Sequence, residues 1–423
     1  MRQHIGIIIF VIMAIGNALS VYSEVVDTNV QIFDPNFRTL QVKVAGNDQL
    51  PPIIVLDSND RIIVSFDELN EDVRYMRYSV VHCNANWQPS ALVESEYIDG
   101  FNFGNVEDTS FSSGTFAHYV HYRISLPNKD MRLLKSGNYL LKVYAEDNPD
   151  ETLLQARFSV CEKEIDVMAD VTSRTDIDYN SNSQQVSVKV ATRNYEVRDL
   201  YSDLKLYVSQ NSRPDNEIMI SRPLIVGRGS AVFEHNKSLI FPAGNEFRRF
   251  EVVSTNYPGM RVENIEYHNP YYHATLYTDK VRTHEPYTYD STQHGRYTVR
   301  ELNATNSDVS ADYVVVHFSL DAQEMHGGRL YLNGDFTRHQ FTPSTMMKYN
   351  GETGRYELDI MLKQGSYNYQ YLWVPDGSNV GFTEATEGNH YQTVNEYLIK
   401  VYHRPQGERY DRFIGFAMVF SGR

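Results

Sequence analysis

The sequence predicts an all-β protein made of three consecutive antiparallel β-sandwich domains behind a signal peptide. The chain has 423 residues, which is enough for two to four domains. Its 31 Tyr and 20 Phe favour half-buried pleated surfaces, and many short segments alternate apolar and polar residues. Hydrophobic residues make up 41% and charged residues 22%, as in globular proteins, so the chain is expected to fold.

The first element is a signal peptide over residues 1–23. Arg2 precedes an apolar run over residues 5–16, and small residues at Ser20 and Ser23 resemble a cleavage site. The run is shorter than the roughly 20 apolar residues of a spanning helix, and no charged stop-transfer flank follows. We therefore expect an exported protein with no membrane span.

Strands follow throughout the mature chain. In residues 184–191 (QQVSVKVA), valines alternate with Ser187 and Lys189, which is typical of a strand with one buried face. The same period recurs in residues 62–66, 119–126, 139–144, 204–208, 313–320, 356–362 and 397–402. Gly, Asn and Asp turns separate these segments, which indicates antiparallel sandwiches rather than a parallel sheet covered by helices.

Two breaks in this pattern suggest domain boundaries. The first is the acidic stretch at residues 161–164, and the second is the polar segment 282–297, where few apolar residues could anchor a core. The predicted domains are therefore residues 24–162, 163–296 and 297–423.

The search for chemistry is mostly negative. The net charge of −15 would repel a phosphate backbone, so nucleic acid is not an expected partner. No hydrolase, zinc-protease, phosphate-loop or calcium-loop motif occurs, so we expect neither an enzyme nor a cofactor. His268 and His273, with His284 and His294 further on, form the candidate histidine cluster, but Pro270 interrupts any common helix face, so no metal site is expected.

Two cysteines, Cys83 and Cys161, each end a strand-like run. An oxidising compartment would permit a disulfide between them, whereas two buried thiols are equally consistent with the pattern. Neither has the C-x-x-C spacing of a redox or metal-binding thiol. Both alternatives stay open at this point.

The two tryptophans also allow two interpretations, a sugar-binding platform or core packing. Trp87 and Trp373 could form a platform for a sugar ring, although packing in a core is the commoner use of such residues. Tyr367, Tyr369 and Tyr371 alternate with other residues, so one face of their strand is all tyrosine. Such a face is either semi-buried or a recognition surface.

The block from Tyr78 to Asn128, with HCNANW at residues 82–87 and YIDGF at 97–101, resembles the plug protein family of the type IX secretion system. Pro214, just after the turn at residues 209–213, departs from the aromatic residue that this family usually has at that position. The likeness extends along nearly the whole mature chain, through residues 136–141, 158–160, 209–213, 244–250, 387–389, 395–397, 402–405 and 409–411.

The resemblance implies a non-enzymatic periplasmic protein associated with the outer membrane. Members of this family occupy the periplasmic opening of the outer-membrane translocon β-barrel and close it when no cargo passes. The translocon barrel is therefore the expected partner.

An alternative comes from the C-terminal part of the chain. Residues 328–336, 354–356 and 365–371 resemble immunoglobulin-like glycogen- and starch-binding modules. This implies an immunoglobulin-like sandwich, and it leaves open an exported carbohydrate-binding protein that uses Trp373. An exported cargo protein is a third possibility, which ranks lower because residues 413–423 continue directly from the family block.

Tyr97, Gly100 and Phe101 lie in the most family-specific block. Glycine reaches positive φ without steric cost, so Gly100 is expected to form a tight turn that places Tyr97 and Phe101 at the surface or core edge of the first domain. The block would then serve either folding or docking, and folding is the commoner arrangement.

Overall fold

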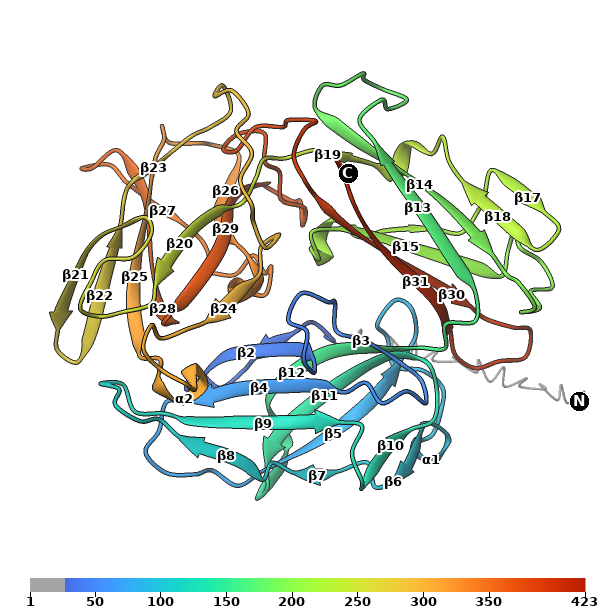
Figure 1. Ribbon diagram of the computed structural model, residues 1–423, viewed down its shortest axis with the longest axis horizontal. Coiled ribbons are helices and arrows are strands. Elements are labelled where there is room, and N and C mark those ends of the chain that lie inside the picture. Colours follow the sequence, from blue (N-terminus) through green and yellow to red (C-terminus); the bar gives the residue numbers. More distant parts are fainter. Residues whose placement is uncertain (1–26, 423) are drawn as a thin grey trace, which may run out of the picture.

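The computed structural model describes residues 27–422, so the predicted signal peptide lies outside the described residues. Strands make up 48% of the structure and helices 4%, which confirms the predicted all-β class. Three pairs of packed sheets surround a common centre (Figure 1). Within residues 27–422, none of the helices has the length and apolarity needed to cross a bilayer.

The first sandwich spans residues 31–161 and packs a six-stranded sheet on a four-stranded one. The larger sheet contains β1 (Gln31–Ile32), β3 (Ile53–Val55), β5 (Met76–Cys83), β7 (Gly104–Asn105), β11 (Gly137–Ala145) and β12 (Asn148–Cys161). The smaller contains β2 (Phe37–Val44), β4 (Ile62–Glu68), β8 (Asp108–Phe111) and β9 (Val120–Leu126). A short helix, α1 (Glu94–Tyr97), leads into the small ribbon of β6 (Ile98–Gly100) and β10 (Met131–Leu133).

The middle sandwich is built from two separate parts of the chain. One sheet contains β13 (Asp166–Thr172), β14 (Ser183–Ala191), β17 (Ile225–Gly227), β18 (Ser230–Phe233) and β19 (Ile240–Pro242). The other has the order β16 (Ile218–Ile220), β15 (Leu204–Gln210), β30 (Glu396–His403) and β31 (Arg412–Phe420). The turns η1 (Pro214–Asn216) and η2 (Lys237–Leu239) connect these strands.

The third sandwich lies between these two parts in the sequence. One sheet contains β20 (Arg248–Val252), β24 (Tyr297–Val299), β26 (Gly328–Asn333) and β29 (Gly365–Pro375). The other contains β21 (Val262–His268), β22 (Tyr271–Leu276), β23 (Asp279–Lys280), β25 (Tyr313–Asp321), β27 (Lys348–Asn350) and β28 (Arg355–Lys363). The helix α2 (Ser307–Ser310) and the turn η3 (Asp335–Thr337) lie on its connections.

The sheet topology differs from the predicted boundaries at residues 296 and 297. The last two strands do not complete the third sandwich, because β30 pairs with β15 of the middle one from Leu204↔His403 to Gln210↔Tyr397. In Figure 1 the red C-terminal strands accordingly lie beside green strands. The third sandwich is therefore an insertion in the middle sandwich.

The alternation predicted for residues 184–191 is confirmed in β14. Val186, Val188 and Val190 are buried in the core of the middle sandwich, whereas Lys189 is exposed. Pairing is antiparallel except in three places, where β3 pairs with β12 and β22 and β23 pair with β25 in parallel. The strictly antiparallel prediction is wrong at these three pairs.

Candidate functional site at the junction of the three sandwiches

A buried polar cluster joins the first sandwich to the third. Asp67 of β4 accepts hydrogen bonds at Oδ2 from the Tyr313 hydroxyl and from Lys363 Nζ, each at 2.6 Å. His121 Nδ1 lies 2.7 Å from Asp67 Oδ1. Burial alone would raise the pKa of Asp67, but Lys363 and His121 outweigh it and lower that pKa below its ordinary value. The carboxylate is therefore held ionised between the two sandwiches.

A second carboxylate fixes the same interface. Asp312, just before β25, accepts hydrogen bonds from the backbone amides of Phe116 at 2.8 Å and Ala117 at 3.0 Å. The Tyr119 hydroxyl donates to the carbonyl oxygen of Ala311 at 2.8 Å. Backbone groups of one sandwich thus depend on the other for their hydrogen bonds.

One ion pair joins the third sandwich to the middle one. Arg296 donates through both terminal nitrogens to the Glu396 carboxylate, at 2.9 and 2.7 Å. Both side chains are buried, and Glu396 is the first residue of β30. A two-pronged guanidinium–carboxylate contact fixes orientation as well as distance.

The first and middle sandwiches meet around Asp411. Its carboxylate accepts hydrogen bonds from the Ala85 amide at 3.1 Å, Lys205 Nζ at 2.9 Å and Arg404 Nε at 2.9 Å. Nearby, the Tyr402 hydroxyl donates to Asn138 Oδ1 at 2.8 Å. All three interfaces are therefore closed by buried, hydrogen-bonded polar groups, which favours one rigid body over three independent domains.

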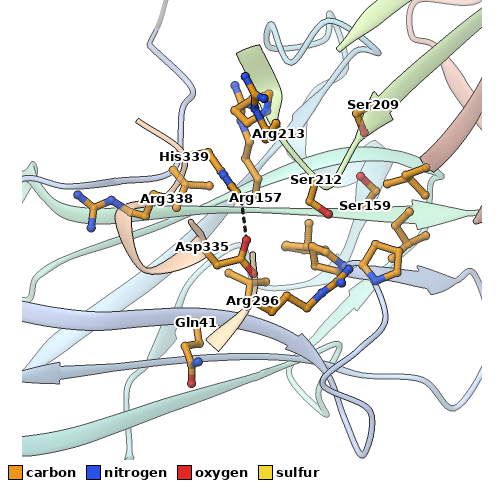
Figure 2. Close-up of a pocket in the computed structure, with 18 of the residues that line it drawn as sticks. Gln41, Arg157, Ser159, Ser209, Ser212, Arg213, Arg296, Asp335, Arg338 and His339 are labelled. Carbon is orange, nitrogen blue, oxygen red and sulfur yellow. Dashed lines mark hydrogen bonds and ion pairs between the residues drawn. The ribbon is translucent and has the colours of Figure 1, made fainter. Parts of the chain in front are cut away.

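A cavity of about 300 Å³ lies where the three sandwiches meet (Figure 2). Its polar wall comes from all three bodies, with Gln41, Arg157 and Ser159 from the first, Ser209, Ser212 and Arg213 from the middle, and Arg296, Asp335, Arg338 and His339 from the third. Asp335 Oδ1 lies 2.7 Å from His339 Nε2, as the dashed line in Figure 2 marks.

The cavity wall is rich in cations although the whole chain is acidic. Six Lys or Arg side chains line it, against three carboxylates. Four of the six cations form ion pairs, and these are Lys43 with Asp48, Lys400 with Glu217, Arg213 with Asp215 and Arg296 with Glu396. Arg157 and Arg338 have no carboxylate within ion-pair distance among residues 27–422.

Trp87, which the sequence placed in the family-specific block as a candidate for core packing or for binding, lies at this cavity. It follows β5 at a φ of 64°, and the Arg157 guanidinium is centred 4.4 Å from its ring. Tyr97 is instead a core residue, only 5% exposed, and its hydroxyl donates to the Val80 carbonyl oxygen at 3.3 Å. The two residues therefore lie in different environments.

Gly100 and its neighbour Phe101 also lie in different environments. Gly100 has a φ of 106°, and a Cβ atom there would lie 2.1 Å from the Asp130 carbonyl oxygen, so this backbone position requires glycine. Phe101 is 65% exposed and contacts Phe103, with ring centroids 5.6 Å apart. The glycine belongs to folding, whereas the phenylalanine is on the surface.

Trp373 and the tyrosine strand belong to the third sandwich. Trp373 is partly buried against the core, and its indole lies so close to Gly328 that a Cβ there would be 2.7 Å from the ring. Tyr367, Tyr369 and Tyr371 are fully buried, and the last two donate hydrogen bonds to Asp279 at 2.7 and 2.9 Å. The tyrosine face is therefore core, and Trp373 lacks a free ring on the side of Gly328.

Cys83 and Cys161 are free, buried thiols in this structure. They lie on β5 and β12, with β11 between them, since Asn138 pairs with both Cys83 and Ser159. Two strand spacings amount to roughly 10 Å, beyond the reach of a disulfide. Burial raises the pKa of each thiol to about 12, which makes both poor nucleophiles.

His268 and His273 lie on the hairpin of β21 and β22, with ring centroids 5.0 Å apart. His273 Nδ1 contacts His317 Nε2 at 2.8 Å, and His317 contacts Asp359. In the part of the chain that the structure describes, no group of three or more His, Cys, Asp or Glu has a metal-binding arrangement.

The sequence reasoning missed the residues that line the junction. Arg157 lies inside the apolar segment LLQARFSVC, where a charged residue in mid-strand is a signal that its face meets another body rather than solvent. Arg338 gives no such signal, because it lies in a polar turn after η3. The Asp67 cluster also could not be found from the sequence, since its members are brought together only by the packing of two sandwiches.

Comparison with known proteins identifies a family and a similar crystal structure. Residues 37–162, which form most of the first sandwich, match the family model of the type 9 secretion system plug protein 1st domain. A crystal structure of a hypothetical protein from Parabacteroides merdae is 44% identical, with a TM-score of 0.92, and the match covers 94% of this chain and all of that one.

A second solved structure is too dissimilar to carry an argument. An alkylpurine DNA glycosylase from Pseudomonas fluorescens, bound to DNA with an abasic site analogue, is 16% identical over 30% of each chain, and its TM-score of 0.19 carries no argument. No curated protein matches the sequence.

Proposed function

The chain belongs to the plug protein family of the type 9 secretion system, and on this premise we propose that it is a non-enzymatic periplasmic plug. In this role it binds the periplasmic opening of the outer-membrane translocon barrel and closes it. The observation that supports the proposal most directly is the family match over residues 37–162.

The architecture suits such a role. A pore wide enough for folded proteins would leak when idle, so its closure needs a body that does not deform or come apart. Buried ion pairs at Asp67 and Arg296 join the third sandwich to the first and to the middle one, and each leaves a buried charge unpaired if its interface opens. Separation of the first and middle sandwiches would leave the Ala85 amide without its acceptor, Asp411. Opening would therefore be costly, and the three sandwiches would move as one piece.

Phe101 and Phe103 are the docking residues that we favour. They are 65% and 48% exposed and contact one another, and the Arg77 guanidinium lies 5.8 Å from the Phe103 ring centroid. Clustered aromatic and Arg side chains are enriched among residues that contribute most to binding at protein interfaces. We call Arg77, Phe101 and Phe103 the aromatic patch.

The test is co-purification from outer membrane solubilised in a mild detergent. The tagged wild-type chain should recover the translocon barrel, and a chain that elutes only as a free monomer would contradict the plug role. Phe101→Ala combined with Phe103→Ala should weaken recovery while the Tm stays nearly unchanged, because both side chains are exposed. Phe111→Ala removes another exposed ring of the first sandwich, at 57% exposure, and should recover the barrel normally.

A further inference from the structure

The cavity at the junction has a lining that the proposed plug role does not require. Its cationic lining is largely neutralised by ion pairs, with two exceptions. Arg157 and Arg338 keep their charge without a carboxylate partner among residues 27–422. A buried or half-buried cation without a counter-ion is costly, so it favours any anion that can reach it.

Arg157 is held in place but not neutralised. Its Nε donates to the Thr28 carbonyl oxygen at 2.6 Å, and its Nη2 donates to Thr28 Oγ1 at 3.1 Å. One face of the guanidinium lies over Trp87. Burial lowers the pKa of Arg157 to about 10, against the smaller opposing effect of Glu217. The guanidinium is thus preorganised by uncharged partners and stays cationic at neutral pH.

Arg338 contributes a second cation from the third sandwich. It follows η3 in a left-handed conformation, with a φ of 55°. Within residues 27–422 its Nε is buried and has no hydrogen-bond partner, so one donor remains available. Burial, reinforced by Arg38, lowers the pKa of Arg338. Buried N–H donors without a hydrogen bond are uncommon in proteins, so this one favours an acceptor supplied by a ligand.

Another part of the wall is apolar. Trp87 lies in this part together with aliphatic and proline side chains that include Leu40, Val42, Leu50, Pro51, Pro52 and Leu398. A volume of about 300 Å³ is at the lower end of the range of roughly 300–1,000 Å³ for small-molecule sites. Apolar walls with a few placed charges are also what such sites use to bind and orient a ligand.

We propose that this cavity binds a small organic anion, in which a carboxylate or phosphate group contacts Arg157 and Arg338 and an apolar body packs against Trp87 and the aliphatic wall. The ligand would contact all three sandwiches at once. Binding would therefore stabilise the assembled body over any state in which the sandwiches separate.

The experiment uses Trp87 as the reporter. The chain has two tryptophans, so Trp373→Phe leaves Trp87 as the only one. In this background, Trp87 fluorescence is titrated with octanoate, octyl phosphate, inorganic phosphate and the neutral octanamide. At least one of the two amphiphilic anions should give a saturable change, and the tighter one identifies the preferred head group. Octanamide should give none, and inorganic phosphate should bind more weakly than octyl phosphate.

Two variants and a control locate the site. Arg157→Gln and Arg338→Gln should each weaken binding by about tenfold or more, as loss of a charge-assisted hydrogen bond does. Arg132→Gln, an exposed arginine paired with Asp99, should bind like the parent chain. If Arg157→Gln does not fold, Arg338→Gln alone decides.

Three results would overturn the proposal. These are no saturable change with either amphiphilic anion, equal binding of octanamide, and unchanged affinity in both arginine variants. Phosphate binding as tight as octyl phosphate would overturn the apolar part of the site. Recovery of the translocon barrel is a separate measurement, so either proposal can fail alone.

Discussion

Gly100 has the backbone conformation that the sequence predicted for it. Only the residue type was needed for that prediction, because positive φ is a local property of glycine. The solvent exposure of the Phe101 side chain was not predictable in the same way. Its exposure depends on which neighbouring segments cover it, and the sequence favoured a buried ring over the surface ring that the structure has.

Gly100→Val should lower the free energy of unfolding by roughly 1–3 kcal/mol, because it adds both backbone strain and a collision with the Asp130 carbonyl. Urea denaturation of the full chain measures this. Gly46→Val is the matched control, since Gly46 has a φ of 79° but nothing within 4 Å of a new Cβ. An unaltered Gly100→Val midpoint, or equal effects at both positions, would contradict the steric argument.

Glu387 predicts a pH dependence of stability. Burial alone would raise its pKa, but Arg248 and Arg282 outweigh this and lower it from 4.5 to about 2. A carboxylate with a depressed pKa in the folded state stabilises above its unfolded pKa. The stabilisation should therefore be complete above about pH 4.5 and be lost as the pH falls toward 2.

Glu387→Gln tests this dependence. It should reduce the free energy of unfolding at pH 7 by roughly 3 kcal/mol, because it leaves buried guanidinium charge unpaired. It should also flatten the loss of stability between pH 4.5 and 2. Denaturation midpoints across that range measure both effects, with the exposed Glu352→Gln as control. If the variant lost stability between pH 4.5 and 2 as steeply as the wild type, the role assigned to Glu387 would be contradicted.

At the scale of elements, the strands were largely predictable and their partners were not. The alternation in residues 397–402 identifies a strand from local pattern alone. It carries no information on whether β30 pairs with β29, its neighbour in sequence, or with β15. Pairing depends on the non-local fit of β30 to the edge of a distant sheet. In the same way β20, which precedes residue 297, pairs with β29 of the third sandwich, so the predicted boundary at residue 297 differs from the observed pairing.

Fragments test the role of the last two strands. A fragment of residues 163–245 contains the middle-sandwich strands except β30 and β31, so it leaves Leu206 and Val208 of β15 without their cross-strand neighbours Val401 and Ile399. We expect it to be insoluble or to lack cooperative unfolding. A fragment of residues 163–422 should unfold cooperatively. Circular dichroism during thermal unfolding compares them, and a stably folded shorter fragment would contradict the observed topology.

At the scale of the whole molecule, the junction could not be read from the sequence. Asp67 and Lys363 are almost 300 positions apart, and each alone looks like an ordinary surface charge. Only their burial at a common interface makes them partners, with side-chain exposures of 1% each. Local patterns predict sandwiches, whereas the packing between sandwiches depends on complementary surfaces that no local pattern encodes.

The pair of Arg296 and Glu396 allows this packing to be measured. Arg296→Met or Glu396→Met alone should destabilise the chain by about 3–5 kcal/mol, because each leaves a buried charge unpaired. The double variant should be less destabilised than the sum of the two. Chemical denaturation of all four chains gives the coupling energy, and additive effects would show that the pair does not hold the interface.

The insertion of the third sandwich has a consequence for biosynthesis. β15 ends at Gln210 and β30 begins at Glu396, so in a chain that is made and exported from its N-terminus β15 is present long before its partner strand. During this time the nascent middle sandwich keeps an unpaired edge and an uncovered apolar face, while the inserted body can already close on itself. Chaperone binding should therefore concentrate on the middle sandwich, and slow folding of the inserted body should delay completion of the middle one as well.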